Sequence, residues 1–207
     1  MKRLSFVVSA PSGTGKTTII QNIIGHSDNY EFVISTTTRP RRNDEIDGKN
    51  YIFVQENIFK NMIEESAFIE WAFVHQHYYG ITKKEIDRIR DSGKTPIFDV
   101  DVQGAKSLRK KLADGVFIFI VPPSVEALKE RLMNRKTETE EQIAVRLNNA
   151  LNEMRQYELY DYLIVNEKVE ESCDQFNAIL VSESCRKERN YNKIRNMVGG
   201  DRDHSIK

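Results

Sequence analysis

The feature that most constrains the fold is a glycine-containing turn near the amino terminus, which joins an apolar run to an amphipathic segment. The turn reads Ala10-Pro11-Ser12-Gly13-Thr14-Gly15-Lys16-Thr17, and it matches a phosphate-binding loop except that Ala10 replaces the first glycine. Leu4 to Ser9 before it is typical of a buried strand, and apolar residues at helical spacing predict a helix over Lys16 to Gly25. A strand, a glycine loop and a helix in this order predict an α/β nucleotide-binding core.

The chemistry of this turn explains its spacing. Gly13 and Gly15 let backbone N–H groups turn inward around phosphate oxygens, and the following helix points its positive end at the same place. Lys16 is expected to reach the β and γ phosphates, and the Thr17 hydroxyl to ligate Mg²⁺. Ala10 fits the turn provided that its φ is negative. The residues expected to bind ATP here are Ala10, Pro11, Ser12, Gly13, Thr14, Gly15, Lys16, Thr17 and Thr18. The motif alone does not distinguish kinases from ATPases or GTPases.

Three further apolar runs are typical of buried strands. They are Thr95 to Val100, Gly115 to Val121 and Tyr162 to Val165. Helical patterns cover Val102 to Leu112, Val125 to Met133, Thr139 to Leu159, and Val169 to about Tyr191. Strands that alternate with such helices predict a parallel sheet covered on both faces.

Two segments interrupt this alternation. Residues 35–89 contain mixed shorter strands, Tyr51 to Val54 and Ala67 to Val74, with one helix between them, which favours an inserted lobe. The polar tract from Asn134 to Gln142 has no apolar residue to bury, which favours a mobile lid. We therefore expect a core of residues 1–34, 91–133 and 148–207, a lobe of residues 35–90 and a lid of residues 134–147. The polar tail 199–207 is expected to be disordered.

Composition limits the partners and the compartment. The 207 residues include 31 Lys and Arg and 31 Asp and Glu, so no net field draws the chain to a polyanion. Only Cys173 and Cys185 are present, which favours a reducing compartment. The apolar runs are too short for a membrane span or a secretory leader. We expect a cytoplasmic protein, monomeric or homodimeric, that binds neither membranes nor nucleic acid.

Several motifs downstream of the glycine turn occur together in a consistent order. They are Ser35-Thr36-Thr37-Thr38-Arg39-Pro40-Arg41-Arg42 with Glu45, Gly48-Lys49-Asn50-Tyr51, Phe68-Ile69-Glu70-Trp71, Tyr78-Tyr79-Gly80, and Asp99-Val100-Asp101-Val102-Gln103-Gly104. With these motifs the chain resembles guanylate kinase from about Leu4 to Val169. The resemblance implies phosphoryl transfer from ATP to GMP or dGMP with Mg²⁺. It also implies a five-stranded parallel sheet of the P-loop nucleoside monophosphate kinase type, with an inserted mixed α+β GMP-binding lobe and a short lid.

The acceptor phosphate needs charge-assisted donors. Arg39 and Arg42 can supply bidentate guanidinium groups, with the hydroxyls of Tyr51 and Tyr79 beside them. Clustered arginines can instead form a solvated basic turn, and that alternative stays open for the arginines considered alone. The substrate-binding residues that the resemblance implies are Ser35, Arg39, Arg42, Glu45, Tyr51, Glu70, Tyr79 and Asp101.

The resemblance implies that recognition of guanine depends on Glu70. Guanine presents N1–H and an exocyclic amine on one edge, and a carboxylate can accept hydrogen bonds from both, whereas adenine offers no such pair. An outward-facing strand residue is the alternative for Glu70. The chain departs from the family at Ile81, because a Ser or Thr that contacts the guanine region usually stands there. Selectivity for guanine is therefore expected to be weaker or differently built.

The expected catalytic residues are Lys16, Arg39, Asp99, Arg131, Arg135 and Arg146. Asp99 ends an apolar strand, where a carboxylate can hold magnesium, and Asp101 should face the same side. Both carboxylates can instead be ordinary strand-end caps. The resemblance implies that the three later arginines close over the transferring phosphate. Surface arginines that pair with nearby glutamates are the alternative.

The resemblance also implies that Asn166 contacts the adenine of ATP. An asparagine that ends a strand in a turn is the alternative, and the sequence does not decide between the two.

Two other functions fit parts of the sequence. A guanylate-kinase-like interaction module would share the fold without catalysis, but the complete phosphate loop favours an enzyme. A kinase for another phosphorylated acceptor, or an NTPase that binds nucleic acid, is the second alternative. The tail from Cys185 onwards has seven Lys and Arg against three Asp and Glu, which is typical of the solvated face of a last helix.

Overall fold

A five-stranded parallel sheet forms the centre of the computed structural model, which describes residues 4–74, 76–134 and 139–198. The strands lie in the order β2, β7, β1, β8, β9, and every neighbouring pair is parallel. Their bounds are β1 Ser5–Ser9, β2 Tyr30–Phe32, β7 Thr95–Asp99, β8 Gly115–Val121 and β9 Tyr162–Val165. The predicted five-stranded parallel sheet is confirmed.

The edge strand β2 is the strand that the apolar patterns did not identify. It has only three residues, all half-buried, and its central residue is Glu31. It pairs with β7 from Tyr30 opposite Thr95 to Phe32 opposite Ile97. A strand this short with a charged residue at its centre shows no continuous apolar run, so its pairing becomes visible only in three dimensions.

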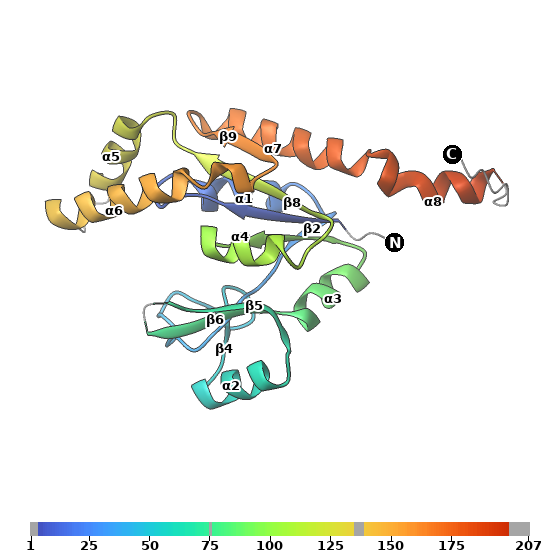
Figure 1. The fold of residues 1–207 in the computed structure, drawn as a ribbon, viewed down its shortest axis with the longest axis horizontal. Coiled ribbons are helices and arrows are strands. Elements are labelled where there is room, and N and C mark those ends of the chain that lie inside the picture. The colour runs from blue at the N-terminus through green and yellow to red at the C-terminus, as the bar shows by residue number, and fades with distance from the viewer. Residues whose placement is uncertain (1–3, 75, 135–138, 199–207) are drawn as a thin grey trace.

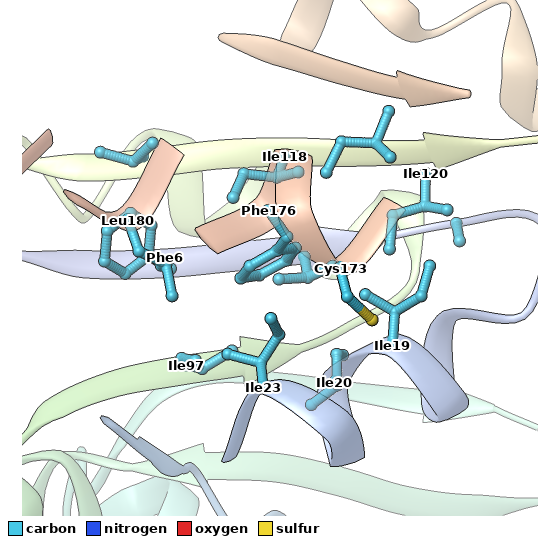
Figure 2. Packing of buried hydrophobic residues seen from close by; sticks show 14 residues of the cluster. Phe6, Ile19, Ile20, Ile23, Ile97, Ile118, Ile120, Cys173, Phe176 and Leu180 are labelled. Carbon is cyan, nitrogen blue, oxygen red and sulfur yellow. The ribbon is translucent and has the colours of Figure 1, made fainter. Parts of the chain in front are cut away.

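Helices cover both faces of this sheet, as Figure 1 shows. Helices α1 (Lys16–Gly25) and α7 (Val169–Ser184) pack on one face, where Ile19 and Ile23 meet Phe176 and Leu180 (Figure 2). Helices α3 (Lys83–Asp91) and α4 (Val102–Arg109) cover the other face. The two sides of each central strand are buried in different clusters, so these strands carry apolar residues on both faces, as predicted.

A second, mixed sheet forms a separate lobe. Its strands are β3 Thr36–Thr37, β4 Ile52–Phe53, β5 Phe68–Val74 and β6 His77–Thr82, in the order β4, β3, β6, β5. Strands β3 and β4 are parallel, whereas β6 is antiparallel to both β3 and β5. Helix α2 (Glu56–Glu64) packs against this sheet through Phe59, which stacks on Phe68 at 4.4 Å between ring centroids. The exact limits of the core, lobe and lid stay a prediction.

Helices α5 (Val125–Met133) and α6 (Glu140–Met154) pack against each other. Leu128 and Leu132 of α5 are buried against Ala150 of α6. Thr139 and Gln142 form a capping box at the start of α6. Helix α6 ends earlier than predicted, and the residues 157–159 at the end of the predicted helix form a separate 3₁₀ turn (η1, Tyr157–Leu159). Residues 135–138 of the expected lid lie outside the described part of the chain, as does the tail 199–207.

The single helix predicted from Val169 to about Tyr191 is wrong. The chain forms α7 up to Ser184 and then a second helix, α8 (Lys187–Met197). The backbone of Arg186 between them has φ −55° and ψ 138°, which is not helical, so the hydrogen-bond ladder is broken there. None of the residues of α8 is buried, and Figure 1 shows this helix extending away from the sheet. Helix α4 also ends earlier than predicted, at Arg109.

Within the described ranges, none of the helices combines the length and the apolar character that crossing a membrane requires.

Candidate active site

The glycine turn lies between β1 and α1 and has the backbone that a phosphate loop needs. Gly13 has φ 92° and Gly15 has φ 90°, values that residues with a Cβ rarely adopt. Gly15 is also the residue that caps the amino terminus of α1. Ser66 and Gln76 are the only described residues other than glycine with positive φ, so the condition set for Ala10 is met. The missing first glycine therefore causes no backbone strain.

The loop is packed closely against its surroundings. A Cβ atom at Gly13 would lie 3.1 Å from Cδ2 of Leu132 in α5. A Cβ atom at Gly15 would lie 2.6 Å from Nδ2 of Asn166. Thr14 is buried, and its hydroxyl donates to the Pro11 carbonyl at 2.9 Å. The shape of the loop is thus fixed by both local and distant contacts.

Lys16 forms an ion pair with Asp99 at the end of β7, and its Nζ also donates to the Val100 carbonyl at 3.3 Å. The first turn of α1 exposes Thr17 and Thr18. Two predicted residues from distant parts of the chain, the loop lysine and the strand-end carboxylate, are therefore in contact.

A cavity of about 310 Å³ lies between the lobe and the carboxyl end of β7. It is lined by six of the predicted site residues, Ser35, Tyr51, Glu70, Tyr79, Asp99 and Asp101, and by Ala72, Val74, Gly80, Ile81, Val100 and Gly104. Asp99 belongs to this cavity and also pairs with Lys16, so the phosphate loop and the cavity share a wall.

Glu70 is buried in this cavity and is 8% exposed. The pairing of β5 with β6 is irregular between Phe68 and Glu70, and such a bulge changes where the side chains of a strand point. No described residue donates a hydrogen bond to the carboxylate. Burial raises the pKa of the Glu70 carboxyl to about 7; the negative charge of Asp101 acts in the same direction, and Lys111 opposes it. A buried acid without a partner beside an open cavity is a candidate for reading a ligand.

The basic turn places Arg39 beside the two tyrosines. The Arg39 guanidinium donates to Glu45 at 2.5 Å and lies 5.4 Å from the ring centroid of Tyr51. The ring centroids of Tyr51 and Tyr79 are 6.1 Å apart, and the ring planes are inclined at 67° in an edge-to-face arrangement. Hydrogen bonding to Glu45 raises the pKa of Arg39, and a smaller contribution in that direction comes from Tyr79, so this guanidinium stays charged.

Arg42 is less tightly held. Its side chain is exposed, and its main-chain N–H donates to the second carboxylate oxygen of Glu45 at 2.8 Å. Glu45 thus fixes the turn that carries both arginines, and the guanidinium of Arg42 does not line the cavity.

Asp101 and Ile81 both line the cavity, and each also has a structural role. Asp101 caps α4 by accepting from the Gly104 N–H at 2.7 Å, so the capping role considered for it is real and coexists with its place in the cavity wall. Ile81 is 1% exposed and packs in the core while it also lines the cavity. Thr82, the next residue, caps α3 and accepts from Glu85 N–H at 3.2 Å. Its hydroxyl does not replace the missing Ser or Thr of the cavity.

Of the three later arginines, Arg146 contacts the phosphate loop and Arg131 contacts Asn166, which itself contacts the loop. Arg131 Nη2 donates to the Asn166 carbonyl at 2.9 Å, and Arg146 of α6 donates to the Ser12 hydroxyl. Arg135 lies outside the described residues. Asn166 is 2% exposed, and its amide donates to the Thr14 carbonyl at 2.6 Å. The site thus joins the loop to α5, α6 and the end of β9.

Some residues of the site were not predicted. Ala72 and Val74 line the cavity beside Glu70, and the period-2 alternation of a strand was a signal that could have identified them. Lys111, which follows α4, donates to the Ile69 carbonyl at 2.7 Å and links the end of this helix to the lobe. The Ser172 hydroxyl donates a hydrogen bond to Oδ1 of Asn166 at 3.0 Å. No sequence signal marks Lys111 or Ser172. The partner of Lys111 lies far away along the chain, and the contact of Ser172 depends on side-chain orientation.

The parallel sheet, the phosphate loop, the facing cavity with its buried acid, and Arg39 beside the cavity residue Tyr51 define a P-loop kinase of the nucleoside monophosphate kinase class. The family model described as guanylate kinase matches residues 2–183. The chain therefore belongs to the guanylate kinase family, and the resemblance found in the sequence is confirmed.

Individual relatives agree with this assignment. The chain is 43% identical over 195 residues to a protein named guanylate kinase from Caldanaerobacter subterraneus subsp. tengcongensis, with 93% of this chain and 95% of that protein covered. A guanylate kinase from Syntrophotalea carbinolica is 46% identical over 191 residues, which are 91% of each chain. The crystal structure of guanylate kinase from Anaplasma phagocytophilum superposes with a TM-score of 0.73 at 29% identity, covering 96% of this chain and 97% of that one.

Proposed function

We propose that this chain transfers the γ-phosphoryl group of ATP to GMP, giving ADP and GDP, and that it accepts dGMP as well. The observation that supports this most strongly is the double role of Asp99, which lines the acceptor cavity and pairs with Lys16 of the phosphate loop. A donor phosphate at the loop and an acceptor phosphate in the cavity would then face each other. Phosphoryl transfer depends mainly on such positioning and on neutralising charge.

On the donor side, Lys16 and the loop amides would bind the phosphates of ATP. Lys16 would exchange Asp99 for the β and γ phosphates when the nucleotide binds. The exposed Thr17 hydroxyl and the Asp99 carboxylate are hard oxygen donors, which fit Mg²⁺. Mg²⁺ held by these two groups would neutralise charge on the phosphates. Arg131, Arg135 and Arg146 would then contact the transferring group from the side of α5 and α6.

On the acceptor side, Glu70 would accept hydrogen bonds from N1–H and the exocyclic amine of guanine, with Ser35 and Asp101 beside it. Arg39 and Arg42, with the hydroxyls of Tyr51 and Tyr79, would bind the phosphate of GMP. The pairing of Arg39 with Glu45 supports this because it holds the guanidinium next to both tyrosines. dGMP presents the same base and the same phosphate, so the same contacts apply to it.

The free thiols of Cys173 and Cys185 support a reducing compartment, and we propose the cytoplasm as the site of action.

A panel of acceptors tests the proposed function. Purified protein is incubated with ATP and Mg²⁺, and ADP formation is followed with GMP, dGMP, AMP or UMP as the acceptor. We expect turnover with GMP and dGMP, and rates lower by about 10²-fold or more with AMP and UMP, because Glu70 would stay unpaired against those bases. Equal rates with all four acceptors would refute the role of Glu70. Absence of turnover with every acceptor would favour the interaction module.

The affinity for GMP is expected to depend on pH through Glu70. The pKa of its carboxyl is about 7 in the free protein against an ordinary 4.5, so the acid is largely protonated below neutral pH. A protonated acid directs an O–H at the N–H groups of guanine. We therefore expect the dissociation constant of GMP to rise about tenfold as the pH falls from about 8 to about 6, as the competent fraction falls.

Isothermal titration calorimetry at constant ionic strength measures this effect. The phosphate of GMP itself titrates at about pH 6, so Glu70→Gln serves as the control that keeps this contribution and removes the carboxyl. The pH dependence in the variant should shrink to that of the phosphate. An identical pH profile in both proteins would show that Glu70 does not contact the base in its ionised form.

A further inference from the structure

Asn166 connects the phosphate loop to β8 and α7 through hydrogen bonds. It follows β9, and its own N–H donates to the Val121 carbonyl at 2.8 Å, which fixes its main chain to the sheet. Its side-chain Nδ2 donates to the Thr14 carbonyl at 2.6 Å, across 152 positions of sequence. Its Oδ1 accepts from the hydroxyl of Ser172 in α7 at 3.0 Å. A carbonyl can only accept, so the contact with Thr14 also fixes which side of the amide carries the nitrogen.

The partner of Asn166 is a peptide group of the loop itself. In a planar trans peptide the carbonyl and the following N–H point in opposite directions. A Thr14 carbonyl directed at Asn166 therefore directs the N–H of Gly15 away from Asn166. A Cβ atom at Gly15 would lie 2.6 Å from Nδ2 of Asn166, so the amide occupies the space beside the Gly15 backbone and restricts rotation of this peptide.

The main-chain carbonyl of Asn166 also accepts a hydrogen bond from an arginine of α5. Arg131 Nη2 donates to its carbonyl oxygen at 2.9 Å. One residue thus connects the loop, through its side chain, with Arg131, through its main chain. Both Asn166 and Ser172 are almost completely buried, with 2% and 1% of their surfaces exposed, so the side-chain amide offers very little surface to a bound base.

We propose that Asn166 is a positioning residue for the phosphoryl donor, and that it acts by orienting the Thr14–Gly15 peptide so that the Gly15 N–H faces the phosphates. This proposal rests on the proposed function for the identity of the reaction. It differs from the contact with adenine that the family resemblance implies for the same residue. The two roles differ in whether the base of the donor matters.

Inorganic tripolyphosphate distinguishes the two roles, because it carries the phosphates of ATP without a base. Its affinity and that of ATP are measured by calorimetry, without GMP, for the unmodified protein and for Asn166→Ala. We expect both dissociation constants to rise by about tenfold, the size of one well-placed hydrogen bond. An ATP affinity that falls while the tripolyphosphate affinity is unchanged would overturn the proposal and assign Asn166 to the base.

Ser172→Ala provides a second variant with a milder change. It removes the hydroxyl that holds Oδ1 and leaves Asn166 itself intact, so we expect both affinities to fall in the same direction by about two- to fivefold. Unchanged affinities for both ligands in Asn166→Ala and Ser172→Ala, with melting temperatures near that of the unmodified protein, would also overturn the proposal.

Asn190→Ala in α8 is the matched control, because its amide likewise donates to a main-chain carbonyl, that of Ser184 at 2.8 Å, in a helix outside the site. We expect neither affinity to change in this variant.

Steady-state kinetics separate positioning from a general loss of structure. In Asn166→Ala, kcat/KM for ATP should fall while the KM for GMP stays within about twofold, because the acceptor cavity does not include Asn166. A parallel rise in the KM for GMP would indicate a general structural defect and contradict the assignment. The binding comparison needs no acceptor, so it decides the role of Asn166 even if the unmodified protein does not phosphorylate GMP.

Discussion

Lys16→Met is expected to lower kcat by about 10²–10³-fold, the usual effect of removing one preorganised charge from a developing transition state. In the structure Lys16 is held by the Asp99 carboxylate and the Val100 carbonyl, so it lies where the loop meets the acceptor cavity. Methionine keeps the length and the apolar stem of lysine and removes its charge. The loss should appear mainly in kcat, because the charge matters most when the γ phosphate is in transit.

Lys60→Met is the matched control for this experiment. Lys60 lies in α2 and forms an exposed ion pair with Glu56 at 2.7 Å, and it does not line the cavity. We expect its kcat to stay within about twofold of the unmodified protein, as for exposed pairs in general. If Lys16→Met kept more than about a third of the original kcat, the loop lysine would not stabilise the transferring group.

Glu70→Gln is expected to raise the KM for GMP by about 10²-fold and to change the KM for ATP by less than about threefold. The amide directs one N–H at a base edge that itself carries two donors, so one hydrogen bond is lost and two donors oppose each other. The edge of adenine has one donor and one acceptor, which an amide matches. The same variant should therefore also use AMP better than the unmodified protein does, and competition between GMP and AMP measures the change.

Stability separates this effect from unfolding. The pKa of Glu70 is raised on folding, from 4.5 to about 7, so ionisation of this carboxyl destabilises the native state increasingly as the pH rises through that interval. Glu70→Gln should therefore unfold at the same or a higher temperature at pH 8. Glu183→Gln, which changes another buried glutamate, one that pairs with Arg186 and Arg189, is the control and should leave the KM for GMP unchanged. Equal increases of the KM for GMP and the KM for ATP in Glu70→Gln would contradict the assignment of Glu70 to the base.

The elements that the sequence predicted well are those whose signal is local. The phosphate loop and α1 combine glycines, a lysine and helical spacing within sixteen residues, from Ala10 to Gly25, and the structure reproduces the helix at its predicted limits. Strands buried on both sides, such as β8, show continuous apolar runs. Strand β2 has neither signal, and the break near Arg186 interrupts a pattern that remains amphipathic on both sides, so both became visible only in the structure.

The sequence motifs identified residues of the site, but not the contacts between them. Glu70, Arg39 and the two tyrosines were identified from motifs, and the structure brings them to one cavity or its edge. That Lys16 is held by Asp99, that Asp101 caps α4, and that Asn166 reaches Thr14 are contacts between distant parts of the chain. No local pattern encodes such contacts, because they depend on how the sheet and the lobe bring the segments together.

The most direct test of the central claim follows the phosphorus atom itself. The purified protein is incubated with Mg²⁺, GMP and ATP labelled in its γ-phosphoryl group, and the products are separated. The account predicts that the label appears in the β phosphate of GDP, that this depends on GMP, and that Lys16→Met suppresses it. Label that remains in ATP, or that appears only as inorganic phosphate, would contradict the claim that the phosphate loop and the Glu70 cavity hold two substrates face to face.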